Sequence, residues 1–92
     1  MKLEQLHIIC KNETRKAFDE FKRQIDVRLF SFDEVLKDNL QRQMFEQIGM
    51  GITKNIFKGE VSKSDLRVLN DTINQYKYIA YKTSNNYSKL FL

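Results

Sequence analysis

The feature that most constrains this 92-residue chain is a long, unbroken apolar pattern between residues 32 and 58. Apolar side chains recur there at every fourth position, and the chain contains no proline that could interrupt a helix. A spacing of four residues is typical of a helix, and about 27 residues at ~1.5 Å each predict a rod roughly 40 Å long. The repeated positions are Leu36, Leu40, Met44, Ile48, Ile52 and Ile56.

The residues before this pattern form a capping box, Ser-Phe-Asp-Glu. The Ser31 hydroxyl can accept a hydrogen bond from the backbone N–H of Glu34, whose carboxylate can reach back to the backbone of Ser31. Phe30 and Val35 occupy the two positions of a hydrophobic staple. At the other end, Gly59 suits a C-terminal cap. These signals predict where the long helix begins and ends.

A second helix is predicted over residues 63–81, with Ser62 as its N-cap. Because only three residues separate it from the first helix, we expect an antiparallel helical hairpin formed by residues 32–58 and 63–81. Residues 76–81 are rich in aromatic side chains and can alternatively pair as a strand. The apolar seam of this second helix alternates steps of three and four residues, at Leu66, Leu69, Ile73, Tyr76 and Ala80.

The N-terminal third is compatible with two structures. Apolar residues occupy alternate positions in residues 6–10 and again in residues 25–29, which indicates two strands with a helix between them. The alternative is one helix over residues 13–30. Taking the strand–helix–strand reading, the predicted fold class is α+β, mainly α, in a single domain of residues 1–92.

Composition argues against an enzyme. The chain has one cysteine, Cys10, and one histidine, His7, so neither a disulfide framework nor a multi-histidine metal site is expected. On a strand these two side chains would point to opposite faces, which rules out a nucleophilic Cys–His pair. No cluster of acidic residues suggests acid–base chemistry. We therefore expect no catalytic residue, no cofactor, no bound metal and no small-molecule substrate.

The location of the protein can also be narrowed. No apolar run approaches the length needed to span a membrane, and the first residues lack the apolar stretch of a signal peptide. We therefore expect a protein that is not secreted and that works in the cytoplasm or inside a virion. Frequent Lys, Asn, Ile, Phe and Tyr suggest an AT-rich coding sequence, which is common among bacteriophages.

The central helix suggests a protein partner. Its apolar arc covers on the order of 200°, about twice what a helix on one flat surface needs. A chain of 92 residues is expected to lack the surface to cover this arc, and Gly51 inside the arc would admit another backbone. We therefore expect a small non-enzymatic structural or interaction protein, a subunit of a larger assembly such as a bacteriophage virion. The predicted interface with a protein partner or a second copy, including the end of a docking tail over residues 83–92, is Met44, Ile48, Gly51, Ile52, Phe91 and Leu92.

The alternative function is a small basic regulator that binds nucleic acid. The net charge is +4, and the final 21 residues contain no acidic side chain. Aromatic rings can stack on bases while lysines neutralise phosphates. The residues predicted to make these contacts are Tyr76, Lys77, Tyr78, Tyr81, Lys82 and Lys89.

Overall fold

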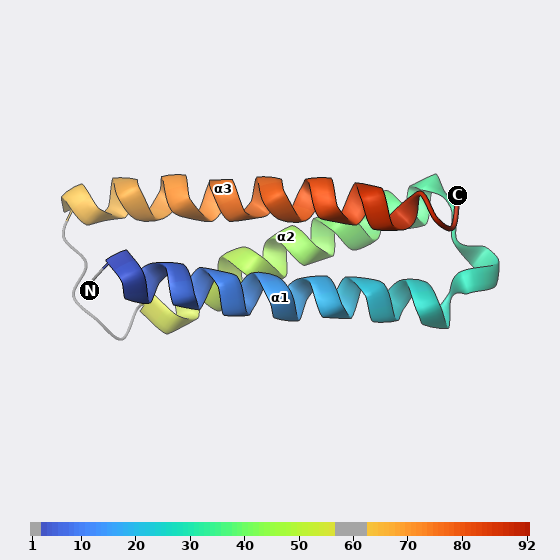
Figure 1. The fold of residues 1–92 in the computed structure, drawn as a ribbon, viewed down its shortest axis with the longest axis horizontal. Coiled ribbons are helices and arrows are strands. Elements are labelled where there is room, and N and C mark those ends of the chain that lie inside the picture. Colours follow the sequence, from blue (N-terminus) through green and yellow to red (C-terminus); the bar gives the residue numbers. More distant parts are fainter. Residues whose placement is uncertain (1–2, 57–62) are drawn as a thin grey trace.

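Three long helices lie side by side in the computed structural model, which describes residues 3–56 and 63–92 (Figure 1). A short 3₁₀ turn, η1, joins the first helix to the second. The bundle measures 47 × 19 × 19 Å, so its length is that of a single helix. The elements are α1 (Leu3–Val27), η1 (Leu29–Ser31), α2 (Glu34–Ile56) and α3 (Lys63–Ser88).

The predicted strand–helix–strand segment is wrong, because α1 is one continuous helix and the described residues contain no strand. Apolar side chains that alternate also recur at helical spacing, and five positions of α1 are buried on one face. Two short strands would have had no further strand to pair with, whereas one helix buries this face against two others. The alternative helix, residues 13–30, also began ten residues too late. The buried positions are Leu6, Cys10, Ala17, Phe21 and Ile25.

Acid–base pairs three residues apart support α1 along its length. They join Glu13 to Lys16, Asp19 to Lys22 and Glu20 to Arg23. Hydrogen bonds from Arg23 and then Gln24 lower the pKa of Glu20 to about 2. This charge spacing belongs to a helix and has no equivalent in a strand, where neighbouring side chains on one face are two residues apart.

The predicted antiparallel hairpin is confirmed in α2 and α3. The side-chain amide nitrogen of Gln41, Nε2, donates to Ser84 Oγ at 2.9 Å and to Asn85 Oδ1 at 2.7 Å. One turn further along α2, the Phe45 ring lies 6.1 Å from the Tyr81 ring. Four residues forward in α2 thus correspond to about four residues backward in α3. The strand alternative for residues 76–81 does not occur, because these residues are helical.

Of the two helix starts predicted from capping signals, the start of α2 can be compared with the structure. Asp33, not Ser31, caps α2, because Asp33 Oδ1 accepts the backbone N–H of Leu36 at 2.8 Å. Ser31 lies within η1, where its hydroxyl donates to the carbonyl of Arg28. The first turn of α2 therefore begins two residues later than predicted. The caps predicted at residues 59 and 62 lie outside the described residues.

Helix α3 runs in the same direction as α1. His7 Nδ1 lies 3.0 Å from the Tyr76 hydroxyl, and the Phe18 ring lies 6.0 Å from the Tyr87 ring. The second contact lies further along both helices by the same number of residues, so α1 and α3 are parallel. The bundle thus has an up–down–up order, with α2 antiparallel to both neighbours (Figure 1).

One core is shared by all three helices. On α2 the buried apolar positions are four residues apart, and α1 and α3 both pack against this helix. The chain therefore covers the apolar arc of its own central helix. The core consists of Leu6, Cys10, Ala17, Phe21, Ile25, Leu40, Met44, Ile48, Ile52, Ile56, Ile73 and Ala80.

This core can be tested at Ile48, whose side chain solvent does not reach. Ile48→Ala should lower the free energy of unfolding by about 2–5 kcal/mol, because the truncation leaves a cavity. Met50 on the same helix is 72% exposed, so Met50→Ala should change the free energy of unfolding by less than about 0.5 kcal/mol. Urea unfolding followed by circular dichroism measures both values. Equal midpoints for the two variants would place Ile48 outside the core.

Candidate protein-interaction surface

Three residues predicted to meet a partner are instead inside the bundle. Residues of the same chain cover Met44, Ile48 and Ile52, and the exposed fraction of each is 2% or less. The prediction assumed that the N-terminal third was a small α/β unit with little surface to offer α2. Because α1 is a full-length helix, it covers the half of the arc that α3 leaves open. The width of this arc therefore gives no reason to invoke a second molecule.

Gly51 faces α1 rather than another molecule. A Cβ built at this position would lie 3.0 Å from the carboxyl carbon of Glu13, so the Glu13 side chain occupies the space that a larger residue 51 would need. The Glu13 carboxylate accepts a hydrogen bond from Asn55 at 3.0 Å, which ties the side chain over the glycine. The predicted close approach of another backbone is not seen: at the crossing of α1 and α2, a side chain of the same chain fills the space beside Gly51.

Enlarging this glycine should strain that crossing. Gly51→Leu should lower the free energy of unfolding by about 1–3 kcal/mol, because the added carbons overlap Glu13. Gly51→Ala should stay within about 1 kcal/mol, since the helix preference of alanine offsets the displacement of Glu13. Adding Glu13→Ala to Gly51→Leu should recover part of the loss in a double-mutant cycle followed by thermal unfolding. Strictly additive effects would show that Glu13 is not the obstacle.

The predicted docking tail is largely part of the bundle. Residues 83–88 are the last turns of α3, and Phe91 lies 6.4 Å from Phe32 and 5.3 Å from Tyr87, ring to ring. Phe91 is therefore half-buried by its own chain. Leu92 is exposed, so it alone of the six predicted interface residues offers a substantial apolar side chain to solvent.

Of the thirteen exposed large apolar residues in the described part of the chain, six belong to the segments at one end of the bundle, where η1 joins α1 to α2 and where α3 ends (Figure 1). Phe30 is fully exposed, and five other large apolar residues of these segments are 46–76% exposed. The contact of Phe32 with Phe91 connects the η1 side of this surface to the C-terminal side. We call this surface the end patch; it consists of Val27, Leu29, Phe30, Val35, Leu90 and Leu92.

Two end-patch residues were expected to have a different role. Phe30 and Val35 were expected to pack together as a staple, yet both point into solvent, Phe30 fully and Val35 at 69%. The staple needs the cap at Ser31, and the cap at Asp33 shifts the register so that neither residue covers the other. A signal for the patch was present, because Val27, Leu29 and Phe30 are apolar although they lie beyond Ile25, the last core position of α1.

The residues predicted to contact nucleic acid are split among three surfaces. Tyr76 faces α1, where it contacts His7. Lys77 lies over Gly49 and Tyr81 lies against Phe45, so both face α2. The outer face of α3 carries the remaining three. They are Tyr78, Lys82 and Lys89, with the Lys82 ammonium 4.9 Å from the centre of the Tyr78 ring.

The two residues considered for chemistry are three positions apart on α1, so the prediction that a strand would send them to opposite faces is wrong. Cys10 is fully buried in the core, and this burial raises the pKa of its thiol. His7 pairs with the hydroxyl of Tyr76, whose pKa is raised by burial and then by Cys10. Among residues 3–56 and 63–92, no group of three His, Cys, Asp or Glu side chains could hold a metal ion. None of the described helices is long and apolar enough to cross a membrane.

Comparisons with known proteins do not assign this chain to a family. No protein-family model matches it, and neither a curated protein nor a solved structure shows significant similarity to it. The functional conclusions below therefore depend on the residues and their geometry.

Proposed function

We propose that this chain is a small non-enzymatic interaction protein that joins a larger assembly through the end patch. The observation that carries the proposal is the exposure of six large apolar residues at one end, led by the fully exposed Phe30. Solitary exposed apolar residues are common, but a contiguous group marks an interaction site in a monomeric protein. The AT-rich coding bias makes a bacteriophage virion the assembly to test first, and cytoplasm or virion interior the expected location.

The size of the patch favours a larger partner over a second copy of the chain. The end of the bundle spans 19 × 19 Å between Cα atoms, on the order of 400 Å², whereas a standard interface buries roughly 800 Å² on each partner. Two bundles meeting end to end would therefore bury too little area for a stable dimer. A partner with a pocket for Phe30 gains more from the same patch, because a buried aromatic anchor supplies much of the energy of such interfaces.

Photo-crosslinking tests this proposal in the cells that produce the protein. A benzophenone amino acid at Val27 should form one defined adduct heavier than a dimer of the 11.0 kDa chain, and the same group at Met50 should form none. Phe30→Ser should abolish the adduct while leaving the unfolding midpoint unchanged, since Phe30 makes no core contact. Adducts of equal yield from Val27 and Met50, or none from Val27, would overturn the proposal.

Binding to nucleic acid is the second candidate, supported by the outer face of α3. Lys82 and Lys89 line a shallow depression there together with Asn85 and Asn86, and neither lysine has an ion pair in the described part of the chain. Tyr78 adds an exposed aromatic ring under Lys82. Lysines, amides and a ring on one helical face suit contacts to phosphates and to an unpaired base.

Salt titration tests this second candidate. Fluorescence anisotropy with labelled single-stranded DNA and RNA should show an affinity that falls as salt rises. Changing Lys82 and Lys89 together to glutamate should weaken binding. It should also reduce the slope of log affinity against log salt by the amount expected for about two lost phosphate contacts. Changing Arg42 and Lys54, which are exposed on α2, to glutamate makes the same change in net charge and should have a smaller effect. No binding at low salt would remove this candidate.

A further inference from the structure

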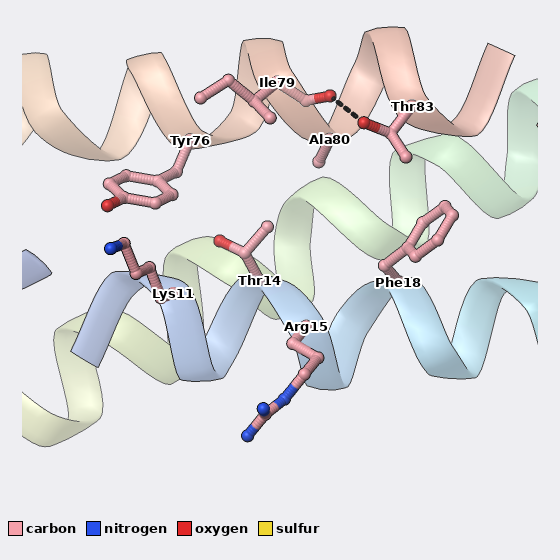
Figure 2. A pocket seen from close by; sticks show the side chains of 8 residues that line it. All are labelled: Lys11, Thr14, Arg15, Phe18, Tyr76, Ile79, Ala80 and Thr83. Atoms are coloured by element: carbon pink, nitrogen blue, oxygen red, sulfur yellow. Dashed lines mark hydrogen bonds between the residues drawn. The ribbon is translucent and has the colours of Figure 1, made fainter. Parts of the chain in front are cut away.

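A groove with a volume of about 280 Å³ runs along the surface between α1 and α3 (Figure 2). It is separate from the end patch and from the outer face of α3. Figure 2 shows α2 passing behind it, so the two parallel helices form its walls. Its lining includes Lys11, Thr14 and Phe18 from α1 and Tyr76, Ile79 and Ala80 from α3.

The two ends of this groove differ in chemistry. At one end the lining carries the Lys11 ammonium and the hydroxyl groups of Thr14 and Tyr76 (Figure 2). At the other end the lining is the Phe18 ring and the side chains of Ile79 and Ala80. Thr83 borders the apolar end, but its hydroxyl donates to the carbonyl of Ile79 at 2.9 Å and so offers no free donor.

The polar end has hydrogen-bonding groups without partners. The Thr14 hydroxyl oxygen is buried yet forms no hydrogen bond, although buried polar atoms are nearly always paired. Lys11 forms no ion pair within the described part of the chain. The Tyr76 hydroxyl lies 3.0 Å from His7 Nδ1 and can accept from the protonated nitrogen while donating its own hydrogen to another group.

We propose that this groove binds a medium-chain carboxylate, a fatty-acid anion with its chain along the two helices. The carboxylate would accept hydrogen bonds from the Lys11 ammonium and the Tyr76 hydroxyl, and a rotation of the Thr14 side chain about χ1 would bring its buried hydroxyl to the same carboxylate. Its alkyl chain would lie against Phe18, Ile79 and Ala80. An ionised acceptor suits this set, because all three groups can donate and hydrogen bonds to a charged acceptor are the stronger ones.

The dimensions of the groove limit the length of the chain. From Lys11 to Phe18 the helix rises about 10 Å, which matches an alkyl chain of moderate length better than a long one. The volume lies just below the ~300–1,000 Å³ of typical small-molecule sites. On α1 the lining ends at Phe18, whose ring contacts the Tyr87 ring edge-on at 6.0 Å between ring centres. A longer chain would have to leave the groove.

Titration with octanoate, followed by ¹H–¹⁵N correlation spectra of the full chain, tests the proposal. Octanoate should cause saturable shifts confined to the backbone amides around Lys11, Thr14, Tyr76 and Ile79. Octan-1-ol, which lacks the charge, should bind at least about tenfold more weakly, and acetate, which lacks the chain, should cause no saturable shift. These two probes separate the contribution of the head group from that of the chain.

Matched variants locate the site. Lys11→Met should weaken octanoate binding about tenfold, because the side-chain length is kept and the charge is lost. Lys82→Met removes the same charge from α3 outside the groove and should leave the affinity unchanged. Thr14→Val should also weaken binding, and it should raise the unfolding midpoint if the buried hydroxyl is unpaired in the free protein.

Three results would each overturn the proposal. Octanoate shifts centred on the end patch would show general adsorption to exposed apolar surface. Equal affinities for octanoate and octan-1-ol would show that the polar end plays no part. Unchanged octanoate affinity in Lys11→Met, with spectra that show a folded protein, would remove the lysine from the site. Because the end patch contributes nothing to this groove, either proposal can fail while the other holds.

Discussion

The structure depends on covering one helix from two sides. Helix α2 carries apolar residues every four positions, and this spacing winds the apolar stripe around the helix instead of along a single face. Neither α1 nor α3 alone can bury such a stripe. With both in place, Ile48 and Ile52 are completely enclosed. Each outer helix runs antiparallel to α2, so α1 and α3 are parallel to each other, and their outer edges border the groove.

The hairpin of α2 and α3 was predictable because its signals are local. A cap, a repeat at helical spacing and a short connection together determine two antiparallel helices, and Gln41 with Ser84 then fixes how they align. The structure of α1 was not predictable in the same way. Its first apolar residues satisfy both the strand and the helix period, and the choice between them is made by the uncovered side of α2, which lies more than thirty residues away in sequence.

The candidate sites were harder to predict than the fold. Counting apolar residues on α2 identified Met44, Ile48 and Ile52, but whether such residues are core or interface depends on what the rest of the chain can cover. The error about α1 therefore became an error about function. Phe30 was misread because a shift of two residues in the cap turns a packed ring into an exposed one. The groove joins Lys11 to Tyr76 across 65 positions, and no local pattern links them.

The burial of Cys10 gives this protein its own reporter of conformational opening. It is the only cysteine in the chain, it lies in the shared core, and burial raises the pKa of its thiol. Thiol reagents react with the exposed thiolate, so modification has to wait until α1 separates from its neighbours. The rate of modification therefore measures how often the bundle opens, without any added label, and a ligand that holds α1 to α3 would slow it.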